Sequence, residues 1–353
     1  MGRASGSRRV APPVLVEVTR GAVIESRHRG SLAVVEAGGE LTHSLGDAEQ
    51  RIFLRSSAKP FQLAAFVASG LFDGYGLGDE ALAIMAASHS GEDRHVRTVL
   101  SILRGAGLTA SVLQCGTHAP YDLETARRLA RDGEEPTALR HNCSGKHTGM
   151  VLFARALGVP IDTYWQPDHP VQQAILAVVS RVTDVPAGEI ELATDGCGAP
   201  TFGLPLAALA LAFARLADPT SLTDDADGPL ADALRRIRNA MMAHPILVAG
   251  ERRRLDTALM RAEPRRLVAK GGAEGVQAIA LLGTDGQPAR GLALKIEDGD
   301  AAGRARNVAT CAALDQLGAL GSATLERLMP FAAPSIRDPR NNVSGEVRAA
   351  FRL

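Results

Sequence analysis

The sequence is poor in lysine. Of its 39 lysine and arginine residues only four are lysines, Lys59, Lys146, Lys270 and Lys295, so arginine occupies nearly every position at which a permanent positive charge is sufficient. Arginine does not lose its proton in proteins, whereas a desolvated lysine can become a neutral amine that acts as a base or a metal ligand. Three of the lysines lie in segments rich in reactive side chains, and we infer that they are retained for deprotonation. We attribute the fourth, Lys295, to codon bias.

The sequence also lacks an excess of charge and any long apolar run. Its formal net charge is zero, 46% of its residues are hydrophobic and 22% are charged, which is the composition of a compact soluble globule. Neutrality gives no electrostatic reason to expect nucleic acid or an anionic membrane surface as a partner. Residues 1–13 contain no apolar segment long enough for a signal peptide, and no later segment reaches membrane-spanning length without polar interruption. We therefore expect a cytoplasmic protein.

Cysteine is scarce as well. The four cysteines, Cys115, Cys143, Cys197 and Cys311, are too few for a disulfide scaffold in a chain of 353 residues. In a reducing compartment, paired thiols more often indicate a metal site or catalysis. We interpret Cys115 and Cys311 as packing residues, which leaves Cys143 and Cys197 as candidates for chemistry.

Strand-like segments at both ends of the chain enclose a helical middle region. Short valine-rich runs predict strands, and apolar residues at helical spacing predict helices. The predicted strands cover residues 14–18, 31–36, 267–269, 276–282 and 291–296, and the predicted helices cover most of 57–216 together with 230–242 and 301–317. Because the terminal strands must meet to complete a sheet, we predict an α/β fold of the α+β type. Residues 1–13 would form a flexible tail and residues 14–353 a single domain.

A hydroxyl and an amine are separated by three residues in Ser56-Ser57-Ala58-Lys59. On a helix this spacing places both groups on one face, about one turn apart, so that a neutral Lys59 could remove the proton from Ser56. Pro60 is compatible with a helix that begins near Ser57, because a missing N–H costs little in the first turn. Chance matches to this spacing are frequent, but a chain with four lysines offers few chances to form one.

A second candidate hydroxyl belongs to Ser88, which follows an apolar segment. We interpret the neighbouring Ser90 as the N-cap of the next helix. Lys270 follows a predicted strand and precedes two glycines, which would leave open backbone beside its amine. In that position Lys270 could approach Ser88 as a second base or as a cation that orients the substrate.

The most reactive segment is residues 141–147, His-Asn-Cys-Ser-Gly-Lys-His. Residues 195–198, Asp-Gly-Cys-Gly, follow a strand-like run at 191–194 and bring a second thiol. Two thiolates with one nitrogen ligand and one open position would form a tetrahedral zinc site of the catalytic type, since structural sites normally use four protein ligands. A histidine is the usual nitrogen ligand, and the candidates here are His141, His147 and Lys146. The alternative is that the two thiols are free and lie in separate places.

Six segments, in order, resemble the rhizobial-type asparaginases, also called the class 3 or asparaginase II family. They are Ser-Ser-Ala-Lys-Pro-Phe-Gln (56–62), Ser-His-Ser-Gly-Glu (88–92), Asn-Cys-Ser-Gly-Lys-His (142–147), Pro-Asp-His-Pro (167–170), Asp-Gly-Cys-Gly-Ala-Pro (195–200) and Lys-Gly-Gly-Ala-Glu-Gly (270–275). The resemblance extends from about Val14 to Asp298, and no matched motif position is substituted. His244-Pro245 and Arg254-Leu255-Asp256-Thr257 look like further family segments, to which we assign no chemistry.

The resemblance implies that the chain hydrolyses L-asparagine to aspartate and ammonia. It implies a fold similar to serine β-lactamases and glutaminases, an asparaginase-like catalytic domain and a homodimer. It also implies two Ser-Lys pairs, a zinc ion held by two cysteines and a lysine, and a set of substrate-binding residues. The matching catalytic residues are Ser56 with Lys59 and Ser88 with Lys270, the metal ligands are Cys143, Lys146 and Cys197, and the substrate residues are Arg55, Asn142, His147 and Asp195.

On this basis Ser56 would attack the side-chain amide carbon after losing its proton to Lys59, and an acyl-enzyme would form and be hydrolysed by water. Ser88 and Lys270 would relay protons. Arg55 could pair bidentately with the α-carboxylate of the substrate. Zinc could polarise the amide oxygen or orient the α-amino and carboxylate groups.

Two other functions remain open on the sequence alone. A serine acyl hydrolase of the β-lactamase or penicillin-binding type would use the Ser-x-x-Lys and Lys-Gly-Gly segments, but it leaves the paired thiols unexplained, and Ser88-His89-Ser90 replaces the Ser-Asp-Asn element of β-lactamases. A non-catalytic zinc protein that binds an amino acid would use the thiols and leave the Ser-Lys pairs without a role.

Overall fold

The computed structural model describes residues 11–224, 227–284, 286–301 and 303–353. Most of the predicted N-terminal tail, residues 1–10, lies outside the described residues. The division into a tail and a single domain over residues 14–353 stays a prediction. Within the described ranges, every helix is too short or too polar to cross a membrane.

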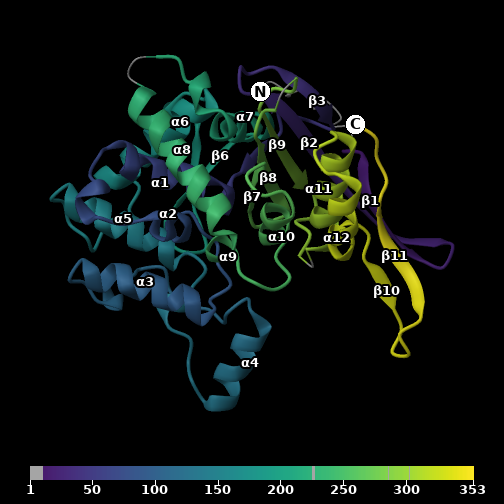
Figure 1. Ribbon diagram of the computed structural model, residues 1–353, viewed down its shortest axis with the longest axis horizontal. Helices are drawn as coiled ribbons and strands as arrows, with labels where there is room; N and C mark the ends of the chain where they lie inside the picture. The colour runs from purple at the N-terminus through teal and green to yellow at the C-terminus, as the bar shows by residue number, and fades with distance from the viewer. Residues whose placement is uncertain (1–10, 225–226, 285, 302) are drawn as a thin grey trace, which may run out of the picture.

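Strands from both ends of the chain form one antiparallel sheet (Figure 1). Its order is β10-β11-β1-β2-β9-β8-β7, and β3 also pairs with β2. The strands are β1 (Val14–Arg20), β2 (Val23–Glu36), β3 (Leu41–Leu45), β7 (Leu267–Gly271), β8 (Val276–Leu281), β9 (Arg290–Ile296), β10 (Ser335–Arg337) and β11 (Val343–Ala349). A smaller sheet has the order β4-β6-β5 and consists of β4 (Arg51–Phe53), β5 (Glu191–Thr194) and β6 (Pro200–Pro205).

Helices fill the middle of the chain and return near its end. In Figure 1 the helices α1 to α6 gather with α8 beside the large sheet, and α4 projects from this group. The helices are α1 (Lys59–Ala68), α2 (Asp79–Met85), α3 (Asp93–Gly105), α4 (Leu123–Asp132), α5 (Ser144–Ala156), α6 (Pro170–Thr183), α7 (Leu206–Ala217), α8 (Gly228–Ala243), α9 (Pro245–Val248), α10 (Leu255–Ala262), α11 (Arg304–Gln316) and α12 (Ser322–Ala332). A short 3-10 helix, η1 (Arg55–Ala58), leads directly into α1.

The predicted mixed fold, with terminal strands in one sheet around a helical middle region, is confirmed. β1 pairs with β11, where Val16 lies opposite Ala349, and β2 pairs with β9. Strands β10, β11 and the first half of β2 were not predicted from the sequence. Residues 23–30 are mostly polar, residues 343–349 alternate polar with small or apolar residues, and much of each segment is exposed. Neither segment therefore contains the apolar run from which the other strands were predicted.

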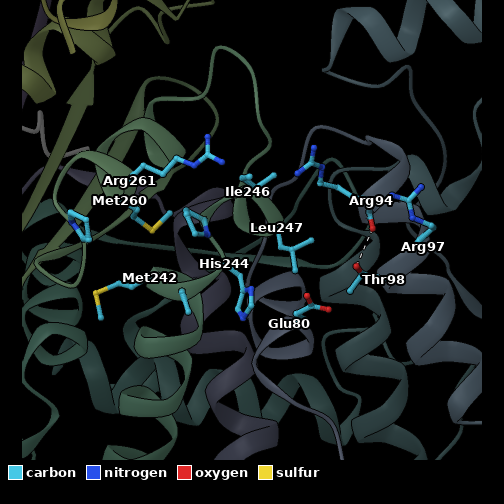
Figure 2. A pocket seen from close by; sticks show the side chains of 13 residues that line it. Glu80, Arg94, Arg97, Thr98, Met242, His244, Ile246, Leu247, Met260 and Arg261 are labelled. Atoms are coloured by element: carbon cyan, nitrogen blue, oxygen red, sulfur yellow. Dashed lines mark hydrogen bonds between the residues drawn. The ribbon is translucent and has the colours of Figure 1, made fainter. Parts of the chain in front are cut away.

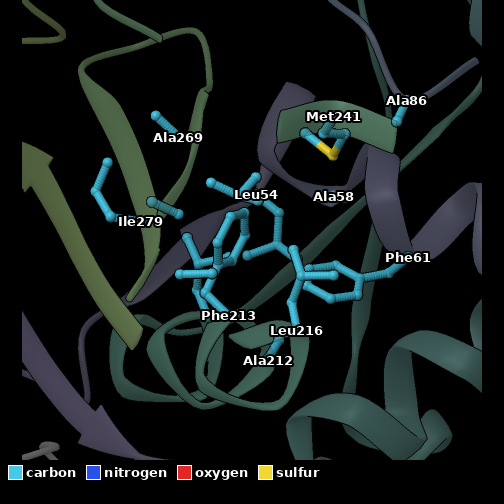
Figure 3. Close-up of a cluster of buried hydrophobic side chains, with 14 of the residues drawn as sticks. Leu54, Ala58, Phe61, Ala86, Ala212, Phe213, Leu216, Met241, Ala269 and Ile279 are labelled. Carbon is cyan, nitrogen blue, oxygen red and sulfur yellow. The ribbon is translucent and has the colours of Figure 1, made fainter. Parts of the chain in front are cut away.

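Helix α7 joins the large sheet to the helical region. It packs against β2, β8 and β9. The ring of Phe213 in α7 meets the ring of Phe61 in α1 edge-on, with centroids 5.4 Å apart, and Figure 3 shows both in a cluster with Ile279 of β8. Burial of such side chains contributes about 1.5–3 kcal/mol each. This cluster holds α1, which begins at Lys59, in a fixed position relative to the sheet that carries Lys270.

Helix α5 lies close against the C-terminal end of α2. A Cβ atom on Gly145 would lie 2.0 Å from the carbonyl oxygen of Ile84, so only glycine allows this approach. The contact brings the first turn of α5, which contains Lys146, near the segment that follows α2 and contains Ser88.

Candidate active site

Ser88 lies between two lysine amines. The Nζ atom of Lys59 is 2.7 Å from the Oγ atom of Ser88, and the Nζ atom of Lys270 is 2.9 Å from the same oxygen. Lys59 comes from the first residue of α1 and Lys270 from β7. All three side chains are buried. The structure thus brings together three of the four predicted catalytic residues in one hydrogen-bonded cluster.

Ser56 has a different environment. It lies in η1, is only partly buried, and its hydroxyl has no hydrogen-bond partner among the residues that the structure describes. The expected Ser56–Lys59 pairing is therefore absent from the observed hydrogen bonds within those residues, and its role in catalysis stays a prediction. The preceding Arg55 has a φ of 51°. A left-handed conformation is uncommon for an arginine, and such strain is often found at functional sites.

The environment of the two amines favours their neutral forms. Burial is the main cause that lowers the pKa of Lys59 below its ordinary value. Burial also lowers the pKa of Lys270 well below its ordinary value, and the charge of Lys59 lowers it further. Two ammonium groups on one buried hydroxyl would repel each other. At least one of the amines is therefore suited to accept a proton from a hydroxyl.

Arg55 and Asp195, two predicted substrate residues, form an ion pair. The Nε atom of Arg55 lies 2.8 Å from Oδ1 of Asp195, and Glu274 is more distant, at 3.9 Å. Asp195 follows β5, as the sequence predicted. The backbone N–H of Arg55 donates to Oγ1 of Thr201. These contacts fix the guanidinium while leaving it about one-quarter exposed.

The two predicted metal-binding thiols lie together, with Lys146 beside them. The Nζ atom of Lys146 is 3.0 Å from Sγ of Cys197. The interaction between the two thiols is the main cause that raises the pKa of Cys143 and lowers the pKa of Cys197. Burial lowers the pKa of Lys146, but the adjacent thiolate charges outweigh it and raise the pKa overall. The two thiols therefore do not lie in separate places.

The two histidines considered as metal ligands are engaged differently. The Nδ1 atom of His147 lies 2.6 Å from the hydroxyl oxygen of Tyr164, and its Nε2 atom has no hydrogen-bond partner in the described part of the chain. Burial lowers the pKa of His147 to about 4. His141 accepts the backbone N–H of Cys143 at Nδ1, at 3.0 Å, and burial lowers its pKa to about 3. Both rings are therefore suited to the neutral form.

The donor set fits zinc in its chemistry. Two sulfur atoms and one amine, all buried, converge near the predicted catalytic residues, and two thiolates with one nitrogen leave an open position on a tetrahedral ion. Within the described residues, no three His, Cys, Asp or Glu side chains are grouped so that they could hold a metal. The cluster here has only two side chains of those four types, because its third donor is a lysine.

Asn142, another predicted substrate residue, adjoins an aromatic group that the sequence analysis missed. Its backbone N–H donates to Nε2 of His118, at 3.0 Å. The His118 ring stacks on Tyr121, with centroids 4.9 Å apart, and Tyr121 is 57% exposed. No motif in residues 114–122 indicated this position, because the contact depends on a segment more than twenty residues away.

The prediction that Ser90 caps a helix is wrong. The N-cap of α3 is Glu92, whose side chain forms a capping box with His95. Ser90 instead donates its hydroxyl to the carbonyl oxygen of Ala249 and accepts from Arg254. Gly91, which has a φ of 74°, and Glu92, which is extended, separate Ser90 from the helix, so the helix begins later than the sequence pattern indicated.

A cavity of about 620 Å³ lies between α3, α8, α9 and α10 (Figure 2). Arg94, Arg97 and Arg261 lie along it, and Ile246 and Leu247 of α9 contribute apolar side chains. None of the predicted site residues, all of which the structure describes, lines this cavity. It is therefore separate from the cluster at Ser88.

Comparisons with known proteins match almost the whole chain to one family. The model of the family described as L-asparaginase II matches residues 16–349. A search of curated proteins finds no match.

Several solved structures match much of the chain. Mglu in its native form has 15% sequence identity and a TM-score of 0.46, and the match covers 83% of this chain and 65% of that chain. This chain therefore spans less than two thirds of the length of Mglu. A beta-lactamase from Burkholderia ambifaria has 19% identity and a TM-score of 0.39, with 83% of this chain and 96% of that chain covered. A probable glutaminase from Bacillus subtilis, complexed with 6-diazo-5-oxo-L-norleucine, has 12% identity and a TM-score of 0.38, with coverages of 82% and 85%.

Proposed function

The chain belongs to the L-asparaginase II family, and from that premise we propose that it hydrolyses the side-chain amide of L-asparagine to L-aspartate and ammonia. Family membership supports an amidohydrolase in general, and the particular substrate is our proposal. The observation that carries it is the pair of buried amines on the hydroxyl of Ser88, because such amines can accept and return protons during acyl transfer.

We assign nucleophilic attack to Ser56, because its hydroxyl is partly exposed, whereas Ser88 is buried and held by both amines. The Ser56 oxygen would form a bond to the amide carbon as its proton passes to Lys59. Collapse of the tetrahedral intermediate would break the carbon–nitrogen bond, and the leaving nitrogen would take a proton and depart as ammonia. Water would then hydrolyse the ester. Catalytic hydrogen bonds are often formed only when substrate is bound.

Ser88 and Lys270 would serve as the proton reservoir behind this step. The Ser88 hydroxyl connects the two amines, so a proton received by Lys59 could be shared with Lys270 without release to solvent. Because burial lowers the pKa of each amine, one of them can remain neutral when the cycle begins.

The substrate residues would recognise the amino-acid end of asparagine. Arg55, oriented by Asp195, offers a planar fork that matches a carboxylate. We propose that Asp195 and Asn142 bind the α-amino group of the substrate and the polar atoms next to it. His147 would support the pocket on the side where the cysteines lie.

Zinc is proposed as the cofactor, held by Cys143, Lys146 and Cys197. When bound there, it would supply a Lewis acid that polarises the amide oxygen or orients the α-amino and carboxylate groups. Coordination requires a neutral Lys146, so metal binding should weaken as pH falls. We also propose a homodimer, which size-exclusion chromatography with light scattering would test against a monomer.

The experiment that tests the function is ammonia release by the purified, zinc-loaded protein with L-asparagine and L-glutamine in parallel. Release from asparagine well above release from glutamine is expected. Acylation of the protein by a penicillin-type probe, with neither amide hydrolysed, would favour a serine acyl hydrolase instead. Stoichiometric zinc without hydrolysis of any amide would favour a non-catalytic amino-acid-binding protein.

A further inference from the structure

We propose that Arg254 and Asp256 are positioning residues, which hold Ser88 and Lys270 in place relative to each other from the first turn of α10. This inference rests on the proposed function, in which Ser88 and Lys270 share protons. Arg254 and Asp256 lie in the segment Arg254-Leu255-Asp256-Thr257, to which the sequence alone assigned no chemistry. In the structure α10 packs against both β7, which carries Lys270, and α9, which leads toward Ser88 (Figure 1).

Arg254 holds the backbone of Ser88. One terminal nitrogen of its guanidinium donates to the carbonyl oxygen of Ser88, at 2.9 Å, and the other donates to the hydroxyl of Ser90, also at 2.9 Å. The N–H of Ser88 donates in turn to the carbonyl oxygen of Val248, at 3.0 Å. Both polar groups of the Ser88 backbone are therefore bonded to the segment 244–256, which fixes the direction of the side chain.

Asp256 holds the strand end that carries Lys270. Its Oδ2 atom accepts the backbone N–H of Gly271, at 2.9 Å, and its Oδ1 atom accepts from the side-chain amide of Gln277, at 2.9 Å. The amine of Lys270 donates to the carbonyl oxygen of the same glycine, at 2.9 Å. A buried carboxylate bound to backbone in this way orients the strand end and also places a negative charge near the amine.

The loop before α10 is tied to the same cluster. The hydroxyl of Thr257 donates to the carbonyl oxygen of Gly250, at 2.7 Å. Gly250 has a φ of 134°, and a Cβ atom there would lie 2.5 Å from the Oγ atom of Ser90, so the loop can approach Ser90 only with glycine at this position. A shift of the loop would therefore displace both Arg254 and the residues that it binds.

Arg254 and Asp256 act on Lys270 with opposite electrostatic sign. Burial is the largest cause of its lowered pKa; the positive charge of Arg254 lowers the pKa further, and the negative charge of Asp256 raises it. Besides this pair, Lys59 and Cys143 act on Lys270, and Arg306 lies at the same strand end, where it donates to the carbonyl oxygen of Gly272. Loss of the Asp256 charge should lower the pKa of Lys270, and loss of the Arg254 charge should raise it.

The test compares Asp256→Asn, Arg254→Met and Arg254→Lys in the full-length, zinc-loaded protein. Asparagine can still accept the Gly271 N–H, and its amide can face Gln277, whose Oε1 atom has no partner among the described residues. Arg254→Lys keeps the charge but loses the fork geometry. The readouts are the pH profile of kcat/KM and the NMR titration of isotope-labelled lysine side chains, which give only four signals. Lys270→Arg identifies the Lys270 signal by removing it.

We expect Asp256→Asn and Arg254→Met to shift the titration midpoint of Lys270 by about one pH unit in opposite directions. The acid limb of the pH profile of kcat/KM should shift with that midpoint. The midpoint should fall in Asp256→Asn and rise in Arg254→Met. Arg254→Lys should leave the midpoint unchanged while kcat falls by about 10²-fold through misplacement of Ser88. Arg253→Asn is the matched control, because Arg253 is exposed and its φ of 55° suits asparagine; it should behave like the wild type.

A merely structural role would reduce the activity or thermal stability of the variants without moving the Lys270 midpoint, and that result would overturn the proposal. A shift of the Lys270 midpoint in the same direction in Asp256→Asn and Arg254→Met would overturn it as well. If Arg254→Met does not fold, Arg254→Gln provides a second neutral variant. The NMR titration needs no turnover, so it decides the role of Arg254 and Asp256 even if the wild type releases no ammonia, a result that would refute the proposed function alone.

Discussion

The amine of Lys59 lies 2.7 Å from the hydroxyl oxygen of Ser88, which is 29 residues later in the chain. This amine does not bond to Ser56, although Ser56 is only three residues earlier. Because η1 gives way to α1 between the two, the Lys59 side chain is directed into the buried cluster, where it also donates to the carbonyl oxygen of Ala87. The two serines therefore differ: Ser56 is partly exposed, whereas Ser88 is buried and bonded to two amines.

The first prediction concerns the two serines. We expect Ser56→Ala to reduce kcat/KM for asparagine by roughly 10⁴-fold or more, as removal of a nucleophile does, with bound zinc unchanged. Ser88→Ala should reduce it less while shifting the pH profile, because the amines lose their shared hydroxyl. Mass spectrometry of protein quenched during turnover, or treated with a diazo-ketone analogue of asparagine, identifies the acylated serine. A label on Ser88 would transfer the role of nucleophile to that residue.

The second prediction concerns the pH dependence of activity. The mechanism needs a neutral amine, and burial lowers the pKa of Lys59 and Lys270 below that of an ordinary lysine. Activity should therefore rise with pH, and the midpoint of that rise should lie below the pKa of a solvated lysine. Lys270→Arg places a permanent charge in the cluster, so its activity should stay low at every pH. Full activity of this variant at high pH would contradict a proton-transfer role for Lys270.

The third prediction concerns zinc. Cys143→Ala and Lys146→Met should each lose bound zinc, because each removes one of three proposed ligands, and elemental analysis after dialysis measures the loss. A site left with two protein ligands falls short of the three that an open tetrahedral zinc site uses, so it should hold the metal more weakly. Cys311→Ala is the matched control, since Cys311 is fully buried in α11 and should leave the zinc content unchanged. Equal zinc contents in all three variants would exclude this ligand set.

The fourth prediction concerns Arg55. Arg55→Lys keeps the positive charge but loses the bidentate fork, so KM for asparagine should rise by about tenfold, equivalent to about 1.4 kcal/mol, with a smaller effect on kcat. Steady-state kinetics measures both constants. Asp195→Asn should produce a similar rise in KM, because Arg55 loses the partner that orients it. A change in kcat alone would instead assign Arg55 to the chemical step.

The fifth prediction concerns acid stability. Burial lowers the pKa of His95 to about 4, whereas an unfolded histidine titrates near its ordinary pKa of 6.5. Between these values the unfolded chain binds the proton and the folded chain does not, so the free energy of unfolding falls as pH decreases from about 6.5 to about 4. The slope is at most about 1.4 kcal/mol per pH unit for each such group. Urea unfolding across this range should show a smaller slope for His95→Gln than for the wild type.

The sequence alone singled out the lysines around which the candidate site is built. Three lysines chosen for their rarity, Lys59, Lys146 and Lys270, are buried beside hydroxyl or thiol groups. Lys295, which we attributed to codon bias, bonds among the described residues only to a neighbouring backbone carbonyl. The strand ahead of Asp195 was predicted at its observed bounds. These features are local, because a short window of sequence contains both the reactive residue and the pattern of its element.

Only the tertiary structure decided which groups meet. Ser88 receives one amine from α1 and another from a strand 182 residues away, and Arg254 reaches the same residue from the start of α10. The position of the Lys146 amine beside Cys197 also depends on how α5 packs against α2. Side-chain spacing along one element fixes only which face a residue occupies, whereas these contacts depend on the closure of the large sheet by the two ends of the chain and on the packing of α1, α7 and α10 against it.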